Sequence, residues 1–180
     1  AEGAIRPCIR ECDGKGEMHR EICARMAEQG LLGAPIPEAW GGSGMDYLSV
    51  AILCEELERA DTAFRVVQSV HVGLNSLALL QWGTDEQKTR WLVPQARGEK
   101  LATFGLTEPG AGNDAGNRSA TARGDGDPYV MSRQAMWQRL ADVEDEVLGL
   151  PSGDRGTGHR GGATRGRRGD MGGRRTGQAT

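Results

Sequence analysis

The chain has 180 residues, of which 37% are hydrophobic, only 4% are aromatic and 28 are glycine, about twice the usual share of glycine. Its four cysteines form no C-x-x-C pair and have no histidine at zinc-finger spacing, which excludes the common zinc modules and favours small, half-buried thiols. The sequence shows no apolar leader and no uninterrupted apolar run of about eighteen residues. We therefore expect a soluble, cytoplasmic protein that does not span a membrane.

The net charge of −3 is divided unevenly along the chain. Residues 149–180 hold seven arginines and two aspartates, so this end is basic (+5) and residues 1–148 are acidic (−8). Such an asymmetry is typical of a separate terminal segment.

Residues 1–97 have the apolar spacing of helices. Two amphipathic segments come first, and their apolar stripes consist of Ile5, Cys8, Ile9 and Cys12 in one and of Met18, Ile22, Cys23 and Met26 in the other. Gly30 is placed to end the second helix. A loop rich in proline and glycine is predicted at residues 31–44.

Residues 45–61 return to helical spacing. The residues predicted to face inward are Leu48, Ala51, Ile52 and Leu57. Glu55 is expected to pair with Arg59, four residues further on, along a solvated face. Residues 62–83 are apolar nearly all round, which is typical of a helix buried among other helices. His71 within them is expected to be a hydrogen-bonded core residue rather than a base.

A last helix is predicted to open at Thr84, because Thr84 and Gln87 form a capping-box pattern, and to stop near Pro94. After Gly98 the spacing changes to that of strands, with a hairpin turn predicted in GDGDPY, residues 124–129. From residue 149 onward no apolar period remains.

The stretch TFGLTEPGAGND, residues 103–114, runs from an apolar strand directly into a hydroxyl, a carboxylate and a glycine-rich turn. Gly110 and Gly112 would let the backbone take positive φ and approach a ligand closely. Backbone amides in such a turn favour anionic oxygens, and the Thr107 hydroxyl can donate or accept a hydrogen bond. The residues alone leave a plain hairpin turn and a ligand loop open, and they do not match the G-x-G-x-x-G dinucleotide pattern.

Trp137 is the second candidate. A lone tryptophan on a strand is usually a core residue, and its functional interpretation is a flat face beside a planar cofactor. Neither a nucleophile–base arrangement nor a set of metal ligands is indicated by local spacing.

Three segments together resemble the acyl-CoA dehydrogenase family. They are LLGAPIPEAWGGSGMDYLSVAILCEELERAD, QWGTDEQKTRWLVPQARGEKLATFGLTEPGAGND and YVMSRQAMWQRLAD, and the resemblance extends over residues 1–148. It implies an α+β fold, with a helical N-terminal domain at 1–98 and an incomplete β-barrel-like middle domain at 99–148. Residues 149–180 are expected to be a disordered tail rich in glycine and arginine.

The resemblance also implies a cofactor and a reaction. Family members bind FAD, oxidise the Cα–Cβ bond of an acyl-CoA thioester and pass the electrons to an electron-transferring flavoprotein. By this resemblance the cofactor contacts would be Phe104, Leu106, Thr107, Gly112, Asn113, Trp137 and Arg139. Asn113 would also reach the substrate, and Trp137 would pack beside the flavin ring.

Two of these residues depart from the family pattern. Asn113 stands where the family usually has a serine or threonine that contacts FAD and substrate. Arg139 stands where the family has a serine or threonine that bonds the flavin near N5. No residue matches the family's catalytic glutamate, which lies in the family's C-terminal part, so we expect these 180 residues to be inactive alone.

Two other interpretations belong to different functional classes. The chain could be a non-catalytic fragment that acts in assembly, although family members form their oligomers mainly through parts not matched here, which makes a homo-oligomer doubtful. The basic tail could bind nucleic acid without specificity, but it has no aromatic residue to stack on bases, and nucleic acid is therefore an unfavoured partner.

Overall fold

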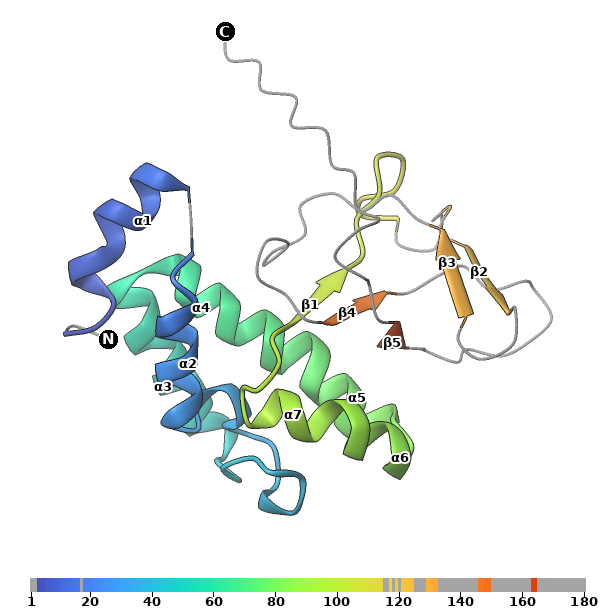
Figure 1. Ribbon diagram of the computed structural model, residues 1–180, viewed down its shortest axis with the longest axis horizontal. Coiled ribbons are helices and arrows are strands. Elements are labelled where there is room, and N and C mark those ends of the chain that lie inside the picture. Colours follow the sequence, from blue (N-terminus) through green and yellow to red (C-terminus); the bar gives the residue numbers. More distant parts are fainter. Residues whose placement is uncertain are drawn as a thin grey trace, which may run out of the picture.

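Helices come first in the chain and strands follow. The computed structural model describes residues 3–16, 18–114, 117 and 119, and the strand residues 121–124, 129–132, 146–149 and 163–164. In Figure 1 the helices gather on one side and the strands on the other, and β1 (Ala102–Gly105) leads from the first group into the second. The helical first part agrees with the sequence. The β-barrel-like form of the second part, and the domain limits at 98 and 148, stay predictions.

The two amphipathic segments at the N-terminus fold as helices. A 3-10 turn at Arg6–Cys8 precedes α1 (Ile9–Lys15), and α2 (Arg20–Glu28) follows. From the second predicted stripe, α2 buries Ile22, Cys23 and Met26. Gly30 follows α2 with a φ of +71°, the left-handed conformation that suits glycine at a helix end, so its predicted role is confirmed.

The segment after α2 is irregular, as predicted, but it is also part of the core. Short 3-10 turns at Leu31–Gly33 and Glu38–Trp40 shape it, and the Ser43 N–H donates to the Gly33 carbonyl at 3.0 Å. A side chain at Gly42 would collide with the Ile36 carbonyl, so glycine is required there. Residues with 0% exposure in this segment are Leu32, Ala34 and Ile36.

The next helix, α3 (Tyr47–Ala60), begins where the Asp46 carboxylate accepts a hydrogen bond from the Ser49 N–H at 2.7 Å. The predicted pairing of Arg59 is wrong. Its guanidinium lies 3.0 Å from the carboxylate of Glu56, three residues earlier, rather than from Glu55. Both side chains are exposed, so the choice of partner changes stability little.

The inward face of α3 was also predicted wrongly for most of its residues. Leu57 is buried, with 3% exposure, but Leu48 and Ile52 are 69% and 54% exposed, and Ala51 is exposed as well. Apolar residues occur on more than one side of this helix, so the spacing alone does not identify the side that packs. The residues that α3 places on the core are Leu53, Leu57 and Ala60.

The apolar segment that follows forms one continuous helix with a π-helical centre. α4 (Thr62–Gln68) passes into π-helical turns at Ser69–Ser76 and then into α5 (Leu77–Trp82). By length and composition alone, Thr62–Trp82 could cross a membrane, which the sequence inspection did not anticipate, and 44% of its most apolar window is buried within the structure. Core helices of soluble proteins pass the same test, and a cytoplasmic location stays a prediction.

The capping box at Thr84 is confirmed. The Gln87 N–H donates to the Thr84 hydroxyl at 3.2 Å, and the Thr84 N–H donates to the Gln87 side-chain oxygen at 2.9 Å. The helix ends at Ala96, two residues after Pro94, which confirms the predicted stop near Pro94. Wide π-helical turns precede the proline, and it lies in the first turn of the last α-helical segment, where a missing N–H interrupts no regular helical turn. The segments are α6 (Asp85–Gln87), the π-helical Lys88–Leu92 and α7 (Val93–Ala96).

Two small sheets are described after residue 101. In one, β1 pairs in parallel with β4 (Glu146–Gly149), which pairs antiparallel with β5 (Ala163–Thr164). In the other, β2 (Thr121–Gly124) and β3 (Tyr129–Ser132) form an antiparallel pair in which Gly124 lies opposite Tyr129. This pairing confirms the predicted hairpin.

Part of the segment expected to be a tail is described as a strand. β5, at residues 163–164, lies within the range 149–180 that was predicted to be disordered. For the remaining residues of that range, apart from Gly149, the prediction falls outside the described residues.

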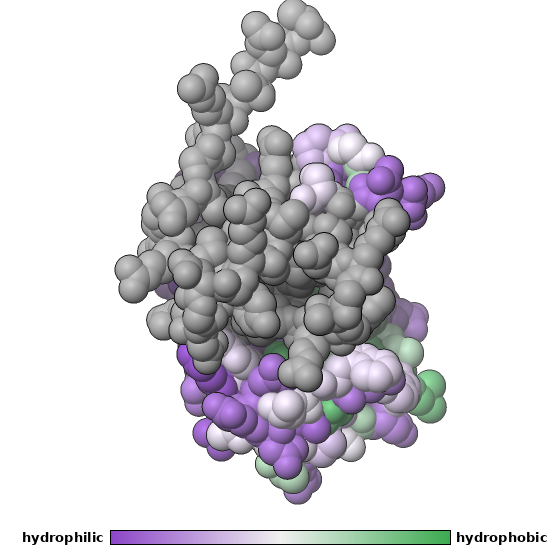
Figure 2. All heavy atoms as spheres, turned by 90° about the vertical axis from the view of Figure 1, so that its right-hand side faces the viewer, coloured by the Kyte–Doolittle hydropathy of each residue, from purple (hydrophilic) through white to green (hydrophobic). Residues whose placement is uncertain are grey.

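Two apolar clusters form the core of the helical part. The larger one contains Ile5, Ile22, Cys23, Met26, Leu32, Leu57, Phe64, Val67 and Leu101. The smaller one contains Ile36, Leu79, Leu92 and Ala96. Seen from the strand side, hydrophilic residues cover much of the described helical surface (Figure 2). Burial raises the pKa of Cys23 to about 11, so this thiol packs as an apolar group.

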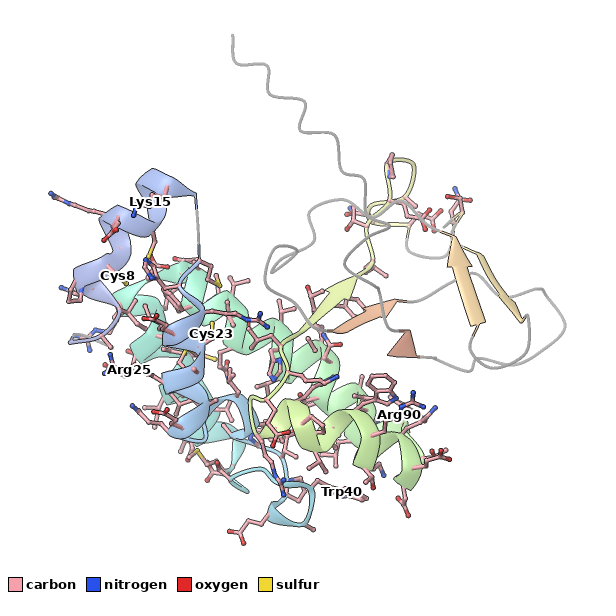
Figure 3. The ribbon with its side chains drawn as sticks, viewed as in Figure 1. Cys8, Lys15, Cys23, Arg25, Trp40 and Arg90 are labelled. Carbon is pink, nitrogen blue, oxygen red and sulfur yellow. The ribbon has the colours of Figure 1, made fainter. Side chains whose placement is uncertain are left out.

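Aromatic and cationic side chains border the smaller cluster. The Lys88 ammonium lies 5.5 Å from the centre of the Trp40 ring, and the Arg90 guanidinium lies 4.8 Å from that of Trp91. Figure 3 shows Arg90 beside the last helices and Trp40 on the loop next to them, whereas Cys23 lies on α2. The Lys88–Trp40 contact attaches the irregular loop to the end of the helical part, whereas Arg90 and Trp91 are neighbours on one helical segment.

Candidate functional site

The candidate loop is carried by β1, which is firmly buried. Ala102 and Thr103 have 0% exposure, and Leu101 before them has 4%. Phe104, the first predicted cofactor contact, is half-buried within the strand. A strand buried in this way gives the loop that follows it a fixed starting point.

The loop begins at Leu106 and Thr107, which are half-buried, and then turns sharply. Glu108 and Ala111 close the turn by two reciprocal backbone hydrogen bonds, each 3.1 Å long. Pro109 and Gly110 at the tip are exposed. The predicted turn is therefore present directly after the strand.

Beyond the turn, Gly112, Asn113 and Asp114 are exposed. The structure thus brings five of the predicted contacts, Phe104, Leu106, Thr107, Gly112 and Asn113, into one continuous stretch. The other two, Trp137 and Arg139, lie outside the described residues, and their contact with the loop stays a prediction.

The two glycines do not use the left-handed conformation that glycine permits. Neither Gly110 nor Gly112 is among the glycines with positive φ, and the turn is closed by the backbone hydrogen bonds of Glu108 and Ala111. A Cβ placed at either position would meet no described atom within 4 Å. Among the described atoms, none gives a steric reason for glycine at either position.

Glu108 is a residue of the site that sequence reasoning did not assign. Its side chain is buried, with 4% exposure, and its Oε2 accepts hydrogen bonds from the Ser119 N–H at 2.7 Å and from the Ser119 hydroxyl at 2.6 Å. The carboxylate thereby ties the loop together across eleven residues. Because the two residues are eleven positions apart, no local spacing indicates this role.

His71 lies beneath the same strand and is a core residue, as predicted. Its Nδ1 accepts a hydrogen bond from the Ala102 N–H at 3.0 Å, and its Nε2 lies 3.0 Å from the Gln95 carbonyl oxygen. Since Nδ1 accepts, the ring proton sits on Nε2, which donates to Gln95. Burial lowers the pKa of His71 below its ordinary value, because the charged ring would be desolvated.

Besides backbone amides, residues 106–114 offer the Thr107 hydroxyl, the Asn113 amide and the carboxylates of Glu108 and Asp114, but no lysine or arginine. Across the described residues, no group of three histidine, cysteine or acidic side chains gathers as metal ligands. The loop can therefore contact a ligand through its backbone and small polar groups.

Comparison with known proteins gives this loop a context. Residues 1–99 match the family model for the acyl-CoA dehydrogenase N-terminal domain. A 3-(aryl)acrylate reductase of Clostridium sporogenes is 37% identical over 161 residues, covering 89% of this chain and 43% of the relative. A short-chain-specific acyl-CoA dehydrogenase of Clostridium acetobutylicum is 35% identical over 161 residues, covering 89% and 42%.

A solved structure is similar as well. The acyl-CoA dehydrogenase of Bacillus anthracis, complexed with FAD, superposes with a TM-score of 0.70 at 36% identity, over 74% of this chain and 23% of that one. The present chain spans about two fifths of the length of the curated relatives it matches. On the match of the family model, the chain belongs to the acyl-CoA dehydrogenase family.

Proposed function

We propose that these residues form the flavin-contacting part of an FAD-dependent oxidoreductase of the acyl-CoA dehydrogenase type. The observation that supports this most is the loop after β1, with a closed turn at Glu108–Ala111 and two glycines that no described atom requires. Because the chain belongs to the acyl-CoA dehydrogenase family, such a loop is suited to lie against a cofactor.

The loop residues fit FAD by chemistry and by space. Gly110 and Gly112 lack the Cβ that would hold a ring or a diphosphate away from the backbone. Thr107 supplies a hydroxyl that can donate or accept, and exposed backbone amides can donate to phosphate oxygens. When bound, FAD would supply the two-electron acceptor that the side chains of this chain lack.

The reaction that we propose is the α,β-dehydrogenation of an acyl-CoA thioester, with an electron-transferring flavoprotein as electron acceptor. Asn113, exposed at the end of the loop, is the proposed substrate contact. No residue of this chain matches the family's catalytic glutamate, so these 180 residues would bind and orient but would not remove the α-proton.

The first test measures FAD binding by the full chain, with fluorescence as the readout. We expect weak binding, lowered at least tenfold by Gly112→Val, because a branched side chain would occupy the cofactor's space. Gly14→Val is the matched control, since Gly14 also has no described atom within 4 Å of its Cβ position but lies on α1. Equal FAD affinity in the Gly112→Val and Gly14→Val proteins would remove the support for this loop.

A second test addresses the reaction. Residues 1–148 are grafted in place of the matching part of the short-chain-specific relative of Clostridium acetobutylicum. The hybrid is expected to retain FAD and to oxidise a short-chain acyl-CoA. One relative is named a reductase of 3-(aryl)acrylates, so the reverse direction is assayed too. A folded hybrid that holds no flavin would contradict the proposal.

A further inference from the structure

We propose that His71 is a positioning residue for the cofactor loop, because it fixes the first residue of the strand that carries this loop. The proposal rests on the function proposed above for the loop itself. His71 lies on the π-helical segment, Ala102 opens β1, and Thr107 follows only five residues later. A shift at Ala102 would therefore be carried along the strand to the loop.

The imidazole links three separate elements. Nδ1 accepts from the Ala102 N–H at 3.0 Å, and Nε2 donates to the Gln95 carbonyl of α7 at 3.0 Å. The ring is completely buried, so water cannot replace either bond. Loss of the imidazole would leave the buried Ala102 N–H without this partner, which couples the position of β1 to that of the ring.

A second contact holds the histidine in place. The Ser76 hydroxyl lies 3.1 Å from the His71 carbonyl oxygen and 3.2 Å from the side-chain oxygen of Gln95. Serine and histidine are five residues apart, which is the spacing of a π-helical turn. The π-helical turns thus place Ser76 where its hydroxyl contacts the backbone of His71 and the side chain of Gln95, the residue that the His71 ring also contacts.

Not every buried polar group of this helix contacts the strand. Gln68 and Asn75 are each 1% exposed, and among the described residues the side-chain nitrogen of each finds no hydrogen-bond partner. The Gln68 oxygen accepts from the Cys54 thiol at 3.1 Å, a bond to α3 rather than to β1. Gln68 is therefore a matched control, since it is equally buried but bonded to a different element.

The test uses the full chain with the variants His71→Leu, His71→Gln and Gln68→Leu. Leucine makes neither bond, whereas a glutamine amide can accept from Ala102 and donate to Gln95. We expect His71→Leu to raise amide exchange in residues 102–108 at least tenfold relative to α2, and to weaken FAD binding at least tenfold. His71→Gln should restore most of both losses, and Gln68→Leu should change neither.

Two results would overturn the proposal. One is that His71→Leu has the same amide exchange and the same FAD affinity as the wild type. The other is that Gln68→Leu shows the same faster exchange in residues 102–108 and the same weaker FAD binding as expected for His71→Leu. If the wild-type chain itself binds no FAD, the proposed function fails, and the exchange data alone then decide whether His71 holds β1. Should His71→Leu not fold, His71→Asn replaces it, because its shorter side chain reaches at most one of the two partners.

Discussion

At the scale of single residues, Glu108 is the side chain on which the shape of the loop depends most. Its carboxylate takes two hydrogen bonds from Ser119 while almost fully buried. Hydrogen bonds to charged groups contribute about 1.5–3 kcal/mol each. We expect Glu108→Ala to lower the free energy of unfolding by about 2–3 kcal/mol, measured by urea denaturation, and Ser119→Ala, which keeps the backbone bond, to lower it by about 1 kcal/mol. Equal stability of Glu108→Ala and wild type would show that this contact does not form.

A second residue-scale prediction separates the two sides of α3. Leu57 is 3% exposed and Leu48 is 69% exposed on the same helix. Leu57→Ala should lower the free energy of unfolding by about 2–5 kcal/mol, because it leaves a cavity in the core. Leu48→Ala, the matched control, should change it by less than about 0.5 kcal/mol in this chain. Urea denaturation measures both, and equal losses in the two variants would mean that both leucines face the core, as the spacing predicted.

A third prediction concerns Asn113, where the family usually has a hydroxyl. Asn113→Ser should strengthen FAD binding, because a shorter hydroxyl restores the usual contact. Asn117→Ser is the control, since Asn117 is also exposed but lies beyond the predicted contacts. Fluorescence titration of FAD measures both. An unchanged or weaker affinity in Asn113→Ser would show that the departure at this position does not limit binding.

At the scale of elements, the sequence predicts helix starts and ends better than it predicts packing. The Thr84–Gln87 capping box and the helix end at Gly30 follow from local backbone chemistry, and both are confirmed. The packed side of α3 depends on neighbouring elements, and π-helical turns have no local spacing of their own, so neither is predicted from the sequence.

The same limit applies to the loop. Its position after a strand and its turn follow from the residues, whereas its closing contact does not. Glu108 and Ser119 are eleven residues apart, and a bond at that distance depends on how the chain folds back. His71 and Ala102 are further apart still, so nothing in the local sequence could have joined them.

Because His71 is buried, we expect the stability of the folded chain to depend on pH. Burial lowers the pKa of His71 in the folded chain, so below the ordinary value of 6.5 the unfolded chain binds a proton that the folded chain does not. Stability should therefore be complete above about pH 6.5 and fall as the pH decreases toward the lowered folded pKa, by up to about 1.4 kcal/mol per unit. Urea midpoints between pH 7.5 and 5 measure this, and His71→Gln should show a flatter profile. Parallel profiles for the two proteins would contradict the assignment.

At the scale of the whole molecule, a helical part precedes strands that begin at residue 102, and the chain spans about two fifths of its curated relatives. Membership of the family rests on residues 1–99, whereas the cofactor contacts that we propose lie just beyond them. Through His71 and the buried strand β1, the helical part therefore fixes the position of the loop.

The most direct test of the flavin-loop proposal is hydrogen exchange of the full chain with and without saturating FAD. Protection is expected in residues 104–113 and not in α1 or α2, because the loop contacts the cofactor while the first helices only pack the core. NAD at the same concentration should give no such protection. Unchanged exchange in 104–113 under FAD saturation, or protection confined to other residues, would contradict the assignment of this loop to the cofactor.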